Sequence, residues 1–281
     1  MTTTVALVSD LHANSTVALC PPVVNRDDGG TYRASAAQRW IWRQWLPYWE
    51  EVAKRREKAG GPLVVILNGE LADDNYHGKF QLVDVNPKTQ MATAIRALEP
   101  MLAILRPEDH IYITRGTEAH SGRSAWMDDA IGADLGAVSP SEGVHSYWHL
   151  RLNVEGVRFD VAHHPPLGPG RVPWTRQLYA TRMASMAYFD ALQAGEKPPD
   201  LYVRGHYHVP SDSYDSYPVR ALALPSWQLT TAFGHRIGGG RPYPIGGAIV
   251  TCDRGKYEVV KRYATWAAGG YESVPTGRDE A

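Results

Sequence analysis

Short runs of apolar residues recur along the chain, and most of them are followed at once by polar residues. Such runs, bounded by turn-forming residues, are typical of buried strands. Two of the runs flank Glu155-Gly156, a pair that favours a hairpin turn. The pattern predicts strands at 5–8, 63–67, 111–114, 147–154, 158–162, 201–204, 219–224, 248–253 and 257–262, and we expect the last three to be antiparallel.

Apolar residues at steps of three and four predict helices at 34–59, 88–105 and 176–192. In the first helix Trp45 and Trp49 lie on one apolar face, and large aromatic side chains in such a stripe are typical of a core. Pro47 lies inside the same helix and predicts a kink or a junction between two helices. The segment 15–31, rich in Pro, Gly and Asn, is expected to be a loop.

The order of these elements favours an α/β fold. Helices and strands alternate early, as in β-α-β units, and strands dominate later. The sequence has no internal repeat and no long linker, which predicts one domain over residues 1–268 and a flexible tail at 269–281. Ligands bind at the carboxyl ends of strands in open α/β sheets. Asp10, His12, Glu70 and the segment 115–120 should therefore meet at one edge.

Composition narrows the class of protein. The 281 residues carry a formal net charge of −1, so no overall field favours nucleic acid or an anionic membrane. A local basic groove would not show in this sum, so binding of nucleic acid stays an alternative. We expect no signal peptide, and no apolar run approaches the ~20 residues of a membrane span. The two cysteines, Cys20 and Cys252, are expected to be reduced thiols of a cytoplasmic protein, with one disulfide left open.

The strongest chemical signal is a pair of motifs in which two metal-ligand residue types flank one residue. Asp10-Leu11-His12 follows the first predicted strand, and His206-Tyr207-His208 follows the strand at 201–204. Residues two apart on a strand face the same side, so each motif can present two ligands to one point. Mixed carboxylate and imidazole ligands suit Mn, Fe, Zn or Ni. The candidate donors suffice for two ions that share a carboxylate, and they are Asp10, His12, Glu70, Glu118, His163 or His164, His206 and His208.

These motifs, in this order, resemble those of the calcineurin-like metallophosphoesterases, including their nuclease-like and phage-type members. The family motifs are Asp-x-His, Gly-Asp-x-x-Asp, Gly-Asn-His-Asp/Glu, a His after a strand, and Gly-His-x-His. The matching segments here are Asp10-Leu11-His12, Gly69-Glu70-Leu71-Ala72-Asp73, Gly116-Thr117-Glu118-Ala119-His120, His163-His164-Pro165-Pro166 and Gly205-His206-Tyr207-His208. The resemblance implies a two-sheet α/β/β/α sandwich of the metallophosphoesterase type. It also implies a phosphoric ester hydrolase with two divalent metal ions, manganese first and iron, zinc or nickel as alternatives.

The resemblance also assigns roles by position. Asp10, His12 and His208 resemble ligands of the first ion. Glu70 takes the place of the carboxylate that bridges the two ions. His163 and His206 resemble ligands of the second ion. His164 stays open as an alternative to its neighbour. Asp73 matches an acid that orients ligands from outside the metal shell.

Two motifs depart from the family. Glu70 stands where the family has Asp, so the spacing of the ions or the activity is expected to differ, and the acids at 73–74 stay open as the bridge. At 117–120, Thr-Glu-Ala-His replaces the Asn ligand and the adjacent catalytic His. We interpret Glu118 as a substitute oxygen ligand, with Thr117 as an alternative. We interpret His120 as the catalytic general acid that protonates the leaving oxygen.

The sequence predicts the substrate only as a class. The resemblance implies that a metal-bound hydroxide hydrolyses a phosphodiester, with DNA or RNA as candidates, or a phosphomonoester. A catalytically degenerate metal-binding scaffold and a cyclic-nucleotide phosphodiesterase are the alternatives, and the oligomeric state stays open. The candidate substrate contacts are Asn14, His77, Arg115 and Arg204, and arginine forks fit phosphate geometry. The alternatives are a turn for Asn14, loop surface for His77 and strand-end salt bridges for the two arginines.

Overall fold

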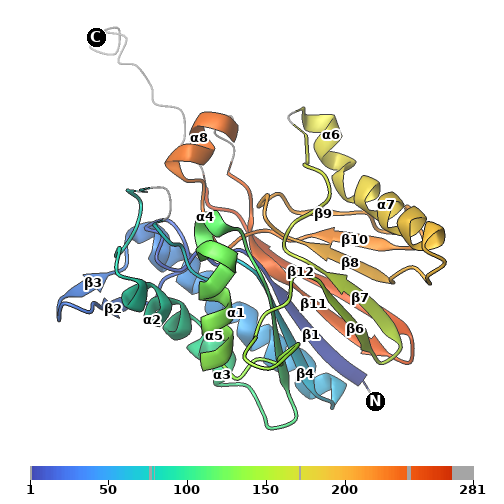
Figure 1. Ribbon diagram of the computed structural model, residues 1–281, viewed down its shortest axis with the longest axis horizontal. Helices are drawn as coiled ribbons and strands as arrows, with labels where there is room; N and C mark the ends of the chain where they lie inside the picture. Colours follow the sequence, from blue (N-terminus) through green and yellow to red (C-terminus); the bar gives the residue numbers. More distant parts are fainter. Residues whose placement is uncertain (1, 76–77, 79, 171, 239–241, 268–281) are drawn as a thin grey trace, which may run out of the picture.

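Two five-stranded sheets lie face to face, and helices cover both outer faces (Figure 1). This computed structural model describes residues 2–75, 78, 80–170, 172–238 and 242–267. The predicted α/β/β/α sandwich is confirmed. The predicted tail at 269–281 and His77 lie outside the described residues.

The first sheet carries the N-terminal strand at its centre. Its order is β12 (Lys256–Ala264), β11 (Ile245–Asp253), β1 (Thr2–Val8), β4 (Leu63–Asn68) and β5 (His110–Thr114). The three strands β1, β4 and β5 are parallel, whereas β11 and β12 are antiparallel as expected. The carboxyl ends of the three parallel strands therefore meet at one edge.

The second sheet has a parallel centre. Its order is β6 (Leu150–Val154), β7 (Val157–Val161), β8 (Leu201–Arg204), β10 (Arg220–Ala223) and β9 (Ser211–Asp212). The turn between β6 and β7 has positive φ at Glu155 (53°) and Gly156 (85°), as a tight hairpin requires. The expectation that β10 is antiparallel to its neighbours is wrong for β8, to which it is parallel. The chain reverses twice after β8, once through the short strand β9, so it returns in the original direction.

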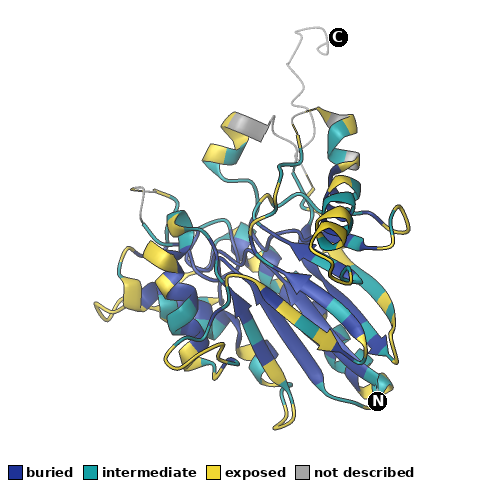
Figure 2. Ribbon diagram, turned by 45° about the vertical axis from the view of Figure 1, so that its right-hand side comes forward, coloured by how far each residue is buried: buried dark blue, intermediate teal, exposed yellow. Residues whose placement is uncertain are grey.

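Alternation along β1 divides the interior into two cores. The strands between the helices are mostly buried (Figure 2). Val5 and Leu7 face the second sheet, whereas Ala6 and Val8 face the helices. All four are fully buried. A strand buried on both faces reads as a continuous apolar run, which is why the sequence marked it.

The first sheet is covered by α1 (Ala36–Ala59), α2 (Pro87–Ala97), α3 (Glu99–Leu102) and α5 (Trp126–Asp134), and the second by α7 (Tyr179–Gln193). Ser35 and Gln38 form a capping box at the start of α1. This helix runs on through Pro47, so it does not divide into two helices. Among the helices formed by described residues, none combines the length and apolar character that crossing a membrane requires.

The other predicted helices are interrupted. The helix expected at 88–105 breaks at Leu98, because Pro100 has no N–H to donate to the carbonyl four residues earlier. The helix expected at 176–192 begins earlier, as α6 (Pro173–Gln177), and breaks at Leu178 before α7. Elements that the apolar pattern did not predict are β2 (Val23–Asn25), β3 (Thr31–Arg33), α4 (Glu118–Ser121), a 3₁₀ turn (Arg123–Ala125), α5, β9 and α8 (Ala232–Gly238). The two cysteines are buried and free.

Candidate metal centre

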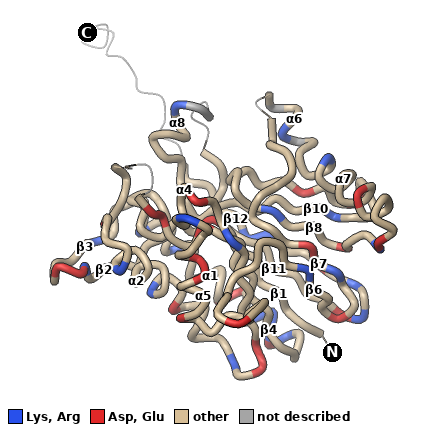
Figure 3. Tube along the Cα trace, in the orientation of Figure 1, with Lys and Arg blue, Asp and Glu red and all other residues tan. Residues whose placement is uncertain are grey.

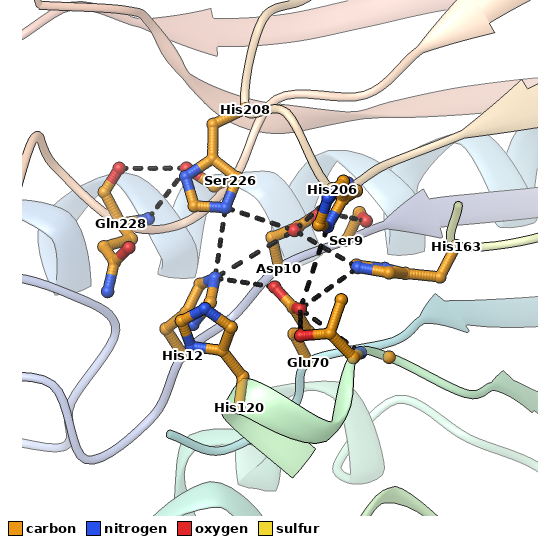
Figure 4. A network of polar contacts seen from close by, with 12 residues as sticks. Ser9, Asp10, His12, Glu70, His120, His163, His206, His208, Ser226 and Gln228 are labelled. Carbon is orange, nitrogen blue, oxygen red and sulfur yellow. Dashed lines mark hydrogen bonds and ion pairs between the residues drawn. The ribbon is translucent and has the colours of Figure 1, made fainter. Parts of the chain in front are cut away.

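Loops that follow four strands bring the candidate ligands together (Figure 4). Asp10 and His12 follow β1, and Glu70 follows β4. His163 follows β7, while the Gly205–His208 loop follows β8. The convergence of Asp10, His12 and Glu70 that the strand order predicted is therefore present in the structure.

Two of the three groups of potential donors among the described residues share one carboxylate. Within each group the donor atoms all lie within 4.8 Å of one another; one group is Asp10, His12, Glu70 and His208, and the other is Glu70, His163 and His206. Glu70 Oε2 lies 3.1 Å from His12 Nε2, and Glu70 Oε1 lies 3.3 Å from His163 Nε2. Each carboxylate oxygen thus faces a different group, as a bridging ligand would.

The state of the imidazole nitrogens tests whether these residues fit metal ions. His163 Nδ1 lies 2.8 Å from the Asn68 carbonyl and donates to it. That bond leaves the lone pair of His163 Nε2 directed at the cluster. This atom and His206 Nδ1 are buried and have no hydrogen-bond partner among the described residues. His12 Nε2 and His208 Nε2 face each other at 3.1 Å. Imidazole nitrogens that converge on buried carboxylates, two of them without hydrogen-bond partners, fit cation ligands, so the donor set fits the predicted ions.

The same packing shifts the proton equilibria of the cluster in the absence of metal. Burial would lower the pKa of His163, but the charges of Glu70 and Asp10 outweigh it and raise the pKa to about 10. Burial lowers the pKa of His206 to about 4. Burial would raise the pKa of Glu70, yet the adjacent His163 and His120 hold it well below its usual value. Glu70 is therefore a charged, acceptor-only group at neutral pH.

His120 lies beside this cluster with a carboxylate behind it. Its Nδ1 is 2.7 Å from Asp73 Oδ1, and its ring contacts the His12 ring edge-on with centroids 4.5 Å apart. A carboxylate on one ring nitrogen fixes the tautomer and the orientation of the ring. The structure thus places the predicted general acid next to the donors, with the predicted orienting acid on its far side.

Glu118 does not lie with the donors. It is exposed, and its Oε1 accepts a hydrogen bond from the Ser124 backbone at 3.1 Å. The reason is local, because α4 begins at Glu118 and directs this side chain over the following turn. The hydroxyl of Thr117 instead donates to Glu70 Oε1. Thr117, rather than Glu118, is therefore the candidate oxygen donor of this loop.

The remaining alternatives are also placed. His164 is exposed beside His206, with ring centroids 5.1 Å apart, so His163 is the donor of this pair that faces Glu70. Asp74 accepts from the backbone of the next residue rather than facing the donors.

Three of the four candidate substrate contacts have other partners. Asn14 is buried and bonds to the backbones of Asp73 and Asp84, so it closes a loop. Arg204 is buried and forms a salt bridge with Asp160 at 2.8 Å, which agrees with the alternative of a strand-end salt bridge. Arg115 donates to Ser146 at 3.0 Å and lies over the Trp148 ring. These contacts support the loops, and a role of the three side chains in substrate binding stays a prediction.

Residues that the sequence did not reveal hold the loops in place. Asp128 on α5 is fully buried and accepts backbone hydrogen bonds from Glu70 (3.3 Å), Leu71 (3.0 Å) and Gly116 (2.8 Å). Ser9 donates to the side chain of Asp10 and to the Asn68 carbonyl. No local pattern distinguishes such an Asp from a surface acid on a helix.

Two glycines allow the loops to approach closely. A Cβ at Gly116 would lie 2.5 Å from Glu70 Cγ, and one at Gly205 would lie 2.7 Å from Asp10 Oδ2. Real Cβ contacts are not this short, so a side chain at either position would displace a donor.

Fold and site together define a two-sheet α/β protein with a candidate dinuclear metal centre. Neither a protein-family model nor a curated protein matches the chain. Among solved structures, it is similar to Vacuolar Protein Sorting 29 from Cryptosporidium parvum (TM-score 0.42, 12% identity, 94% of this chain and 99% of that chain covered). It is also similar to a dimetal phosphatase from Danio rerio (TM-score 0.42, 9% identity, 92% and 96% covered). A predicted phosphoesterase from Streptococcus pneumoniae is a further neighbour (TM-score 0.35, 14% identity, 95% and 94% covered). Likeness at these scores assigns neither family nor function.

Proposed function

We propose that the protein is a metal-dependent phosphoesterase that holds two divalent ions, Mn²⁺ first among them, and hydrolyses phosphodiesters or phosphomonoesters. The observation that carries the proposal is the pair of donor groups that share Glu70. When bound, two divalent ions supply Lewis-acid polarisation of a phosphoryl oxygen and lower the pKa of a coordinated water. The residues themselves bind the ions, orient one another and transfer the proton.

Glu70 and Asp10 provide the negative charge that two cations require. Both carboxyls are fully buried, and the pKa of each is lowered although burial alone would raise it. Their oxygens therefore stay unprotonated at neutral pH. Four imidazoles complete the set, and mixed oxygen and nitrogen donors favour Mn, Fe or Zn over Ca.

His120 supplies the proton for the leaving oxygen. Its Nδ1 is held by Asp73, so Nε2 is the atom that carries the transferable proton. The carboxylate also fixes the orientation of the ring. The contact between the His120 and His12 rings, with centroids 4.5 Å apart, supports this role.

The test combines metal analysis with turnover of bis(4-nitrophenyl) phosphate and 4-nitrophenyl phosphate in the presence of Mn²⁺. We expect two equivalents of metal, turnover of at least one ester, and loss of turnover in Asp10→Asn and His208→Ala. His110→Ala is the matched histidine control, because His110 is exposed at the opposite end of β5. Two equivalents of metal without turnover would favour a scaffold protein, and no metal at all would refute the proposal.

A further inference from the structure

Two segments at the edge of the centre carry no acidic residue. Residues 161–189 and 216–252 contain no Asp or Glu, although the chain has 30 of them and a net charge of −1. The segments include α6 and α8, on which only basic residues are coloured (Figure 3). Both helices project from one end of the molecule, above the loops that carry the donors (Figures 1 and 2). The overall charge of the protein conceals this local excess of positive charge.

Contacts join these segments to the centre and to each other. Tyr207, between the donors His206 and His208, packs against His206 with ring centroids 4.8 Å apart and against Tyr179 of α7 at 6.3 Å. The guanidinium of Arg176 on α6 lies 5.8 Å from the Tyr243 ring, which follows α8. These contacts connect the segment that carries α6 both to the centre and to the segment that carries α8.

Large aromatic side chains are exposed on both helices. Trp174 on α6 is 67% exposed and Phe233 on α8 is 60% exposed. Arg236 is exposed beside Phe233, with its guanidinium 5.7 Å from the ring. Exposed rings interleaved with arginine match a chain that offers flat bases and regularly spaced phosphates. The helices are too short to lie in a membrane as amphipathic anchors, with five and seven residues.

We propose that this surface, defined by Trp174, Arg176, Tyr207, Phe233 and Arg236, binds single-stranded nucleic acid and presents its phosphodiester to the centre. The proposal rests on the proposed function and names its substrate class. A single strand is favoured over a duplex because a ring can stack only on a base that is already unstacked from its neighbours. The arginines contact phosphates without reading sequence.

The test is fluorescence anisotropy of the full chain, in EDTA, with labelled single-stranded DNA and RNA of about 20 nucleotides, a length that exceeds common single-strand site sizes. We expect Trp174→Ala and Phe233→Ala each to weaken binding about 5- to 100-fold, the range of one stacked base. Arg236→Gln should reduce the slope of log affinity against log salt by about 0.7. Phe189→Ala is the matched control, because Phe189 is 54% exposed at the other end of α7 and should leave binding unchanged.

Unaltered affinity in both aromatic variants would overturn the inference, as would equal binding of a duplex or tighter binding to anionic vesicles. Turnover of bis(4-nitrophenyl) phosphate by the unmodified protein tests the proposed function separately. Turnover without single-strand binding refutes only the inference. Single-strand binding that depends on the rings, without turnover of any ester, supports the surface and refutes the enzyme.

Discussion

Replacing Asp128 by Asn tests whether the centre depends on a carboxylate that is not itself a donor. Asp128 Oδ2 accepts from the backbones of Glu70 and Gly116, and Oδ1 accepts from Leu71. An amide has only one oxygen. Its best orientation keeps that oxygen on the first two N–H groups and turns its NH₂ toward Leu71, so one buried N–H faces a donor.

The magnitude follows from these bonds. A buried N–H that loses its acceptor costs about 1–3 kcal/mol, and each of the other two bonds loses about 1 kcal/mol when its acceptor becomes neutral. Burial raises the pKa of Asp128, so removal of its charge offsets part of this loss. We expect Asp128→Asn to lower the free energy of unfolding by about 2–3 kcal/mol. Metal affinity should fall about 10- to 100-fold, as for other groups that orient ligands.

Urea unfolding of the metal-free protein and isothermal titration with Mn²⁺ measure the two effects. Asp134→Asn, on the exposed end of the same helix, is the control and should change neither. A variant that loses stability but binds two equivalents of Mn²⁺ with unaltered affinity would refute the positioning role. Unaltered stability as well would show that the three hydrogen bonds contribute nothing measurable.

Four further predictions concern single residues of the centre. Because the pKa of His163 is raised to about 10, its protonated ring stabilises the metal-free protein fully below pH 6.5, and this stabilisation is lost as pH rises through about 10. Metal uptake at pH 7 should therefore release a proton, which calorimetry in buffers of different ionisation enthalpy detects. Gly116→Ala, whose Cβ would displace Glu70, should reduce the bound Mn²⁺ below two equivalents by metal analysis. Glu118→Gln should retain both metal stoichiometry and turnover, and loss of one equivalent would restore its predicted role. His120→Asn should lower turnover about 10²- to 10⁴-fold on alkyl esters and less on 4-nitrophenyl esters, whose leaving group needs no proton.

Most strands and the gathering of the donors could be predicted from the sequence, because both follow from local patterns. A buried strand is a continuous apolar run, and polar residues directly after it fall at the carboxyl edge of a sheet. The approach of Glu70 to His163, across two sheets, was expected only from the resemblance of the motifs.

The parts that could not be predicted depend on packing between distant segments. Whether Glu118 or Thr117 faces Glu70 depends on the residue at which α4 begins, and the sequence does not fix that residue. The partners of Arg204 and Asp128 are set by how neighbouring loops pack. A strand-end arginine looks the same in sequence whether it binds phosphate or Asp160.

The one-residue spacing of each motif brings its two donors together through the backbone geometry of a loop, and not through the alternation of side chains along a strand. Positive φ angles occur at Asp10 (55°), His12 (45°), Glu70 (54°), His206 (73°) and His208 (56°), beyond the ends of their strands. Each such residue costs of order 1–3 kcal/mol and persists only where surrounding contacts fix it. Here the loops fix each other, because the Asp10 backbone donates to Gly69, the His12 backbone to Glu70, and the His206 backbone to the Asp10 carboxylate. The two donor groups are therefore coupled through the backbone as well as through Glu70, and a change in one loop moves donors of both.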